Sequence, residues 1–190
     1  MKIILFLLGI VEMFLIRQYM KKDYPLDKKT EYIFYIVSAL LVLLFSYRYS
    51  LNIMTVLYLL VLTILLNISF IDYKHEIIPN KLVLPIFIIA VINVLINVTL
   101  YKSLLFGGLF AFVFCFIIYK FSGMGGGDVK LLISLSLLIG FPNTFYLFLI
   151  SFFLGSVYGI IQMLRKKATI KSAISFGPFI TMGFIILCFI

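Results

Sequence analysis

The chain has 190 residues, 64% of them hydrophobic and 12% charged, and a formal net charge of +9 at pH 7. A soluble domain of this length cannot hide so much apolar surface, because its exterior must be covered largely by polar groups. The composition therefore excludes a soluble globular domain and predicts an integral membrane protein. Because the basic residues lie between long apolar runs, the positive charge indicates membrane topology and not nucleic-acid binding.

The apolar runs show no strand-like alternation, which favours helices over a β-barrel, since a spanning segment must satisfy its own backbone hydrogen bonds. We predict an all-α bundle of about eight transmembrane helices, within a range of six to eight. The first run lacks a small-x-small cleavage site and is interpreted as a helix and not as a signal peptide. The sixth run is short for a bilayer, which leaves open a partly re-entrant segment. The predicted segments are 3–16, 31–47, 51–71, 82–98, 104–119, 129–141, 143–164 and 174–190.

The basic residues divide unevenly between alternate connections. Lys2, Arg48 and Lys102 lie on one side, and the other thirteen of the sixteen Lys and Arg residues lie on the opposite side. The positive-inside rule places the thirteen in the cytoplasm and both ends of the chain outside. We therefore expect a single transmembrane domain over residues 1–190. Its expected cytoplasmic loops are a short basic loop at 17–30, a loop at 72–81 and a glycine-rich loop at 120–130.

Two of the seven acidic residues stand at the cytoplasmic ends of predicted helices. Asp72 ends the third apolar segment, and Asp128, in the stretch SGMGGGDVKLL, begins the sixth. Two carboxylates at matching depth in a partly desolvated place repel when both are ionised, so one of them holds a proton. An aspartic protease uses such a pair: the ionised acid draws a proton from water, and the protonated acid polarises the scissile carbonyl. Each acid alone also fits a plainer role, Asp72 as a solvated interfacial group and Asp128 as a helix cap.

Gly125, Gly126 and Gly127 directly precede the second acid. Glycine has no Cβ, so another backbone can approach it closely. A peptide must be extended to be cleaved, and a glycine-rich edge can accept such a peptide by strand-like pairing. These three glycines are therefore candidate substrate-binding residues, with a simple flexible turn as the alternative.

The two acids and their flanks together resemble the motifs of the type IV prepilin peptidase family, the membrane aspartic proteases with a G-x-G-D motif. The pattern of an acid, a short polar stretch and I-P-N-x-L matches Asp72, Ile78, Pro79, Asn80 and Leu82. The pattern G-x-G-D-x-K-L matches Gly125, Gly127, Asp128, Lys130 and Leu131, and F-G-P-F matches residues 176–179. Order and spacing also agree, so the resemblance covers approximately residues 55–190.

The resemblance implies an aspartic endopeptidase with Asp72 and Asp128 as its catalytic residues, in a multi-pass protein of a bacterial cell membrane. Cleavage would remove the leader from prepilins or pseudopilins at the cytoplasmic face. Such a substrate carries a basic leader followed by an apolar helix. Membrane lipid is the other expected partner, and neither nucleic acid nor a cofactor is expected. The oligomeric state is not predicted.

Cysteine content separates this chain from many bacterial members of that family. Those members carry a larger cytoplasmic insertion with paired C-x-x-C metal motifs, and they also N-methylate the new terminus. Here Cys115 and Cys188 each fall inside an apolar run, and there is no C-x-x-C. We therefore expect a minimal form with no metal site, and whether this chain also transfers a methyl group is left open.

Several further residues near the motifs can each be interpreted in two ways. Lys130 either tunes Asp128 and contacts substrate or snorkels to the interface. Pro79 and Asn80 bind substrate if the resemblance holds, and otherwise they start a helix. Gly177-Pro178 starts the last helix or forms a rim of the active site.

Two ionisable residues outside the motifs keep open roles. Glu12 lies inside the first apolar segment, where an acid either contacts substrate or plays a structural, snorkelling part. His75, the single histidine, either titrates in the working pH range or is a solvated loop residue.

Three other functions compete with prepilin cleavage. An ion-coupled transporter would use buried acids near the bilayer midplane, often with inverted repeats. A non-catalytic membrane protein of pilus assembly would not need either aspartate. A third alternative keeps the chemistry and changes the substrate, as in archaeal preflagellin or signal-peptide-type proteases with the same G-x-G-D motif.

Overall fold

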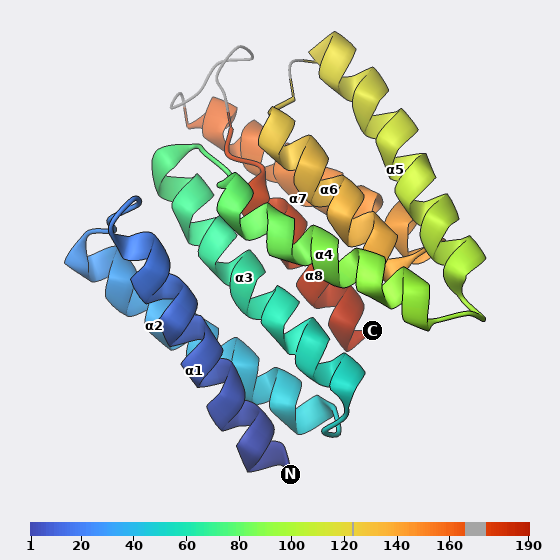
Figure 1. Cartoon of the computed structure of the whole chain (residues 1–190). Helices are drawn as coiled ribbons and strands as arrows, with labels where there is room; N and C mark the ends of the chain where they lie inside the picture. The colour runs from blue at the N-terminus through green and yellow to red at the C-terminus, as the bar shows by residue number, and fades with distance from the viewer. Residues whose placement is uncertain (123, 166–173) are drawn as a thin grey trace.

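The computed structural model describes residues 1–122, 124–165 and 174–190, which form eight α-helices (Figure 1). The helices are α1 (Lys2–Lys21), α2 (Lys28–Arg48), α3 (Ile53–His75), α4 (Asn80–Ile96), α5 (Tyr101–Ser122), α6 (Gly126–Ile139), α7 (Asn143–Leu164) and α8 (Gly177–Phe189). Five of them, α1, α2, α3, α5 and α7, are long and apolar enough to cross a bilayer, and α4 and α8 are shorter apolar helices. The predicted all-α class is confirmed, and the lengths support a polytopic membrane protein.

The helices extend beyond the predicted apolar segments at the ends that carry the acids. α3 continues through His75 and stops where Glu76 takes a left-handed conformation (φ 55°). α6 begins at Gly126, so that Asp128 lies in its first turn. Hydropathy misses these polar turns, although an acid in a first turn is favoured by the positive end of the helix dipole. The expected glycine-rich loop is therefore shorter than 120–130, because Gly126 and Gly127 are helical.

α6 is the short sixth segment. Its 14 residues measure about 21 Å at 1.5 Å per residue, which is less than the roughly 30 Å of hydrocarbon in a bilayer. α6 packs against α4, α5 and α7, and its inward side chains Leu131, Leu132 and Leu135 are fully buried. Apolar packing inside the bundle thus holds this short helix in place.

α3 is the central helix of the bundle (Figure 1). It packs against α1 and α2 on one side and against α4 and α8 on the other. Leu59, Leu65 and Ile68 in its middle are fully buried. One apolar core lies between α1, α2 and α3, and a second core joins α3 to α4, α6 and α8. α3 therefore connects the two cores, and its position fixes the position of Asp72.

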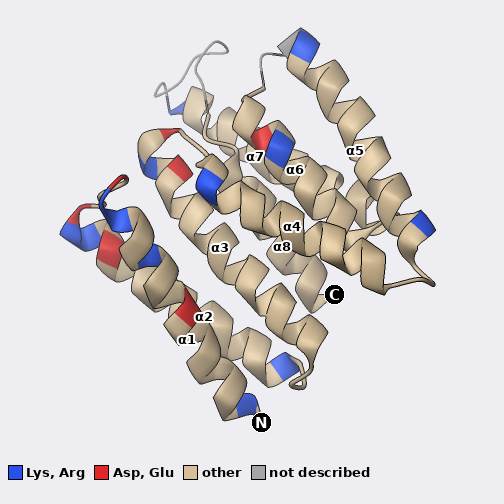
Figure 2. Cartoon of the chain, viewed as in Figure 1, with Lys and Arg blue, Asp and Glu red and all other residues tan. Residues whose placement is uncertain are grey.

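Most charged residues gather at one end of the bundle, where α1, α3, α5 and α7 end and α2, α4, α6 and α8 begin (Figure 2). Lys2, Arg48 and Lys102 lie at the other end. The predicted division of basic residues therefore corresponds to two physical ends. Which end faces the cytoplasm stays a prediction from the positive-inside rule. Lys166, Lys167 and Lys171, which were counted in that prediction, lie outside the described residues.

Candidate active site

Asp72 lies in the last turn of α3 and is 4% exposed. Its Oδ2 accepts a hydrogen bond of 2.8 Å from the backbone N–H of Gly177, at the start of α8. The first N–H groups of a helix have no partner within the helix, and they favour a negative charge at this position. The N-terminus of α8 therefore holds the Asp72 carboxylate and stabilises its ionised form.

Gly177 is fitted closely to that carboxylate. A Cβ at this residue would lie 2.8 Å from Asp72 Oδ2 and 3.2 Å from its Cγ, which is closer than side chains pack. Pro178 follows in the first turn of α8, where its fixed φ and missing N–H suit a helix start. The F-G-P-F stretch thus starts the last helix, and Gly177 also contacts the first aspartate. The reading as a helix start is confirmed, and the reading as a rim of the active site stays a prediction.

Asp128 lies in the first turn of α6, at the same end of the bundle as Asp72. Its Oδ1 is buried and has no hydrogen-bond partner among the described residues. The charges of Asp72 and Asp128 interact, which places the two carboxyl groups within electrostatic range of each other. A buried carboxyl oxygen without a donor, near a second acid, favours the protonated form. The two acids thus have different surroundings, one with a donor and one without.

The glycines before Asp128 differ in what surrounds them. Gly125 and Gly126 are exposed, and a Cβ at Gly126 would meet no other atom within 4 Å. A Cβ at Gly127 would lie 2.9 Å from Cβ of Ile78, in the connection between α3 and α4. Gly127 therefore lets this connection pack against the first turn of α6. A Cβ at Gly125 would lie 2.8 Å from Asp128 Oδ2, so Gly125 leaves room for the second acid, whereas Gly126 borders open space.

Lys130, Asn80 and Pro79 lie on the α4 side of the site. Lys130 Nζ donates to Asn80 Oδ1 at 3.1 Å, which joins the second turn of α6 to the first turn of α4. Pro79 is buried at the N-cap position of α4, and Asn80 is the first residue of that helix. The local reading of Pro79-Asn80 as a helix start is confirmed, and a role in substrate binding stays a prediction.

The connection between α1 and α2 is tied to the end of α3 and the start of α4. Lys74 Nζ lies 3.1 Å from Asp27, and Lys81 Nζ lies 2.7 Å from Asp23. The hydrogen bond from the Thr30 hydroxyl, followed by that from Lys74, holds the pKa of Asp27 well below its usual range. The hydrogen bond and charge of Lys81 likewise lower the pKa of Asp23.

These contacts were not anticipated from the sequence, because they join residues 47 and 58 positions apart. His75 takes part as well, with its Nε2 lying 3.1 Å from the Pro25 carbonyl oxygen. Glu12 lies midway along α1, and one of its buried oxygens has no partner among the described residues. The structure therefore gives His75 a contact with the first connection and leaves the role of Glu12 open.

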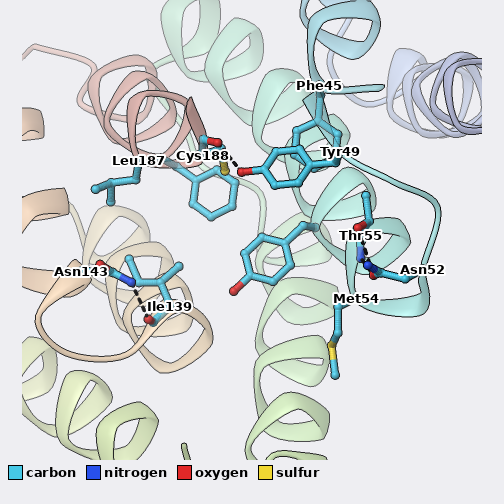
Figure 3. A pocket seen from close by; sticks show the side chains of 11 residues that line it. Phe45, Tyr49, Asn52, Met54, Thr55, Ile139, Asn143, Leu187 and Cys188 are labelled. Carbon is cyan, nitrogen blue, oxygen red and sulfur yellow. Dashed lines mark hydrogen bonds between the residues drawn. The ribbon is translucent and has the colours of Figure 1, made fainter. Parts of the chain in front are cut away.

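A cavity of about 410 Å³ lies at the opposite end of the bundle (Figure 3). Its polar groups largely bond within the protein: the Tyr49 hydroxyl donates to the carbonyl of Cys188, and Asn52 accepts from Thr55. The residues come from the ends of α2, α6 and α8 and from the starts of α3 and α7. This cavity is therefore separate from the aspartates.

The fold and the site define a class: a helical membrane protein that brings two carboxyl groups from distant parts of the chain to one end of its bundle. The sequence pattern of the type IV leader peptidase family matches residues 59–160. The chain therefore belongs to this family. The matched stretch contains both Asp72 and Asp128, whereas Gly177 lies beyond it.

Curated relatives agree with this assignment. The chain is 33% identical over 134 residues to a prepilin leader peptidase/N-methyltransferase of Vibrio cholerae, covering 66% of this chain and 52% of the relative. It is 28% identical over 166 residues to the protein of that name from Legionella pneumophila, covering 80% and 56%. A prepilin peptidase of Methanocaldococcus jannaschii is 31% identical over 137 residues, covering 64% and 38%.

The chain spans about half the length of the bacterial relatives among these three. No solved structure matches it. No group of three or more His, Cys, Asp or Glu side chains suited to a metal occurs in the part of the chain that the structure describes. The expectation that the protein works without a metal stays a prediction.

Proposed function

We propose that this protein is an aspartic endopeptidase that cleaves the leader peptide from prepilins or prepilin-like proteins at the cytoplasmic membrane face. The observation that carries the proposal is that Asp72, in the last turn of α3, and Asp128, in the first turn of α6, lie at the same end of the bundle, where the charge of Asp72 acts on Asp128. Membership of the type IV leader peptidase family supports the reaction class. The position of both acids at helix ends, and not near the middle of a span, favours a protease over an ion-coupled transporter.

The surroundings of the two acids suggest a division of labour. Asp72, held by the Gly177 N–H, acts as the carboxylate base. Asp128, whose buried Oδ1 has no donor among the described residues, carries the shared proton. Water gives a proton to Asp72 while its oxygen attacks the scissile carbonyl carbon, and Asp128 donates to the carbonyl oxygen. The C–N bond then breaks: the leaving nitrogen takes the proton from Asp72, and one hydroxyl of the gem-diol returns its proton to Asp128 as the carbonyl re-forms.

Replacing each acid by Asn tests this function directly. We expect Asp72→Asn and Asp128→Asn each to lower cleavage of a pilin-like substrate by about 10³-fold or more, in membranes or detergent. The double variant should be little worse than either single variant, because the two acids act as one unit. Full cleavage by both single variants would refute the proposal.

Methyl transfer is not part of the proposed activity. The Vibrio cholerae relative is named a peptidase and N-methyltransferase, whereas the Methanocaldococcus jannaschii relative is named a prepilin peptidase only. We expect the mature product to have an unmodified N-terminus even with S-adenosylmethionine present. Mass spectrometry of that terminus measures this, and a methylated product would contradict the expectation.

A further inference from the structure

An apolar groove of about 560 Å³ opens on the surface of the bundle between α2 and α7. We call it the α2–α7 groove. α3 and α8, which pack against each other, supply its buried residues Leu66 and Thr181. Val37 of α2 and Leu154 of α7 lie at its two sides. None of its lining residues is charged.

The groove leads to the first aspartate. Ser69 and Tyr73 line it, and they flank Asp72 within one helical turn of α3. Pro178 also lines it and directly follows Gly177, the residue that donates to Asp72. The end of the groove at Tyr73 and Pro178 is therefore the end nearest Asp72. A chain segment lying in the groove passes beside the acid that we propose as the base.

The dimensions of the groove suit an apolar helix. From Leu66 to Tyr73 the groove follows α3 for about 10 Å at 1.5 Å per residue, which is about two helical turns. A prepilin-like substrate has an apolar helix directly after its cleavage site, and that helix lies in the bilayer. Its first turns must therefore lie within a few residues of the two acids when the bond is cut.

Charge separates this groove from a second one of similar size. A groove of about 570 Å³ lies between α4 and α6, and its lining includes Lys81 and Lys130. Lys81 is paired with Asp23, whereas Lys130 donates to the uncharged Asn80. A substrate whose apolar helix lay there would therefore pass its basic leader over the charge of Lys130. Like charges at close range are unfavourable. The α2–α7 groove offers the same volume without that repulsion.

We infer that the α2–α7 groove binds the apolar helix of the prepilin-like substrate. The inference rests on the proposed function and deepens it. The first turns of the substrate helix lie against Leu66, Thr181 and Met182. Its N-terminal end leaves the groove between Tyr73 and Pro178, where the chain unwinds and the scissile bond reaches Asp72 and Asp128.

Filling the groove is the first test. Met182 lines the α2–α7 groove and is 51% exposed, and Leu84 lines the α4–α6 groove and is 58% exposed. Met182→Trp and Leu84→Trp thus add the same bulk at equally exposed positions. We expect Met182→Trp to lower kcat/KM for the full-length substrate by about tenfold or more, because the apolar helix loses its buried surface. Leu84→Trp should stay within about twofold of the parent.

Photo-crosslinking is the second test, and it does not depend on the folding of a tryptophan variant. A benzophenone amino acid replaces Met182 or Leu84 in the Asp128→Asn background, so that the substrate is bound and not cleaved. We expect a crosslink to residues of the substrate's apolar helix from position 182 and none from position 84. Equal crosslinking from both positions, or crosslinking from position 84 alone, would overturn the inference.

The outcomes separate the inference from the function on which it rests. If the parent protein cleaves no substrate and Asp72→Asn behaves as the parent does, the proposed function fails. If the parent cleaves, Asp72→Asn does not, and Met182→Trp equals Leu84→Trp in kcat/KM, only the groove assignment fails. Lipid alone crosslinking at position 182, with substrate present, would also overturn the groove assignment.

Discussion

Gly177→Ala is the substitution that most directly tests how the first aspartate is held. The added methyl group would lie 2.8 Å from Asp72 Oδ2, 3.1 Å from its Cβ and 3.2 Å from its Cγ. Asp72 is buried and short, so it cannot move aside as the end of a long flexible side chain could. Either the carboxylate or the first turn of α8 must shift, and the 2.8 Å hydrogen bond from Gly177 is lengthened or lost.

The expected loss follows from that hydrogen bond. A hydrogen bond to a charged group contributes about 1.5–3 kcal/mol, and each 1.4 kcal/mol corresponds to about a tenfold change in rate. Loss of the bond therefore lowers kcat by about 10- to 100-fold. Displacing a catalytic group by about 1 Å costs about 100-fold, which is of the same order. KM should change less than kcat, because Gly177 itself does not line the α2–α7 groove.

The assay compares cleavage rates of a pilin-like substrate by purified protein in detergent, together with thermal unfolding. Gly183→Ala is the matched control: it lies on the same helix, and its Cβ would meet the Ser151 hydroxyl at 2.6 Å. We expect both variants to unfold at a lower temperature, and only Gly177→Ala to lose kcat in the folded protein. Normal kcat for folded Gly177→Ala would refute the role assigned to the α8 N-terminus.

Three further substitutions test the supports of the site. Arg17 is buried and donates twice to the Tyr24 carbonyl. Arg17→Ala should therefore lower the free energy of unfolding by about 3 kcal/mol without changing kcat of the folded protein. An unchanged unfolding midpoint would contradict this. Gly127→Ala would bring a methyl group 2.9 Å from Cβ of Ile78, and we expect kcat to fall by about tenfold. An unchanged kcat would show that the connection between α3 and α4 moves aside without disturbing the acids. Asp27→Asn removes an exposed charge, so the unfolding temperature should fall slightly. Because the folded-state pKa of Asp27 is lowered, that difference should be present above about pH 4 and disappear as the pH falls further; a difference that grows on acidification would contradict the assignment.

The sequence determined the class of this protein and the identity of its two acids. Long apolar runs between basic connections require helices that satisfy their own backbone bonds, and this fixed the helical class. Because alternate helices run in opposite directions, the end of α3 and the start of α6 had to lie at the same end of the bundle. Asp72 and Asp128 were therefore predictable as a pair from their positions at segment ends.

Helix ends were less predictable than helix centres. Hydropathy ended the third segment at residue 71, whereas α3 runs through His75, and it started the sixth at residue 129, whereas α6 starts at Gly126. The polar turns that carry both acids are held by capping and by packing against other segments. Hydropathy measures neither capping nor packing between segments.

Only the tertiary structure decided how the two acids differ. The donor to Asp72 comes from Gly177, 105 positions away, and no local pattern says which backbone N–H meets that carboxylate. The tie from Asp23 and Asp27 to the ends of α3 and α4, and the uncharged groove beside Asp72, likewise arise from helices packed side by side. Periodicity and hydropathy act along the chain, whereas burial, hydrogen-bond partners and grooves depend on which surfaces of distant helices meet.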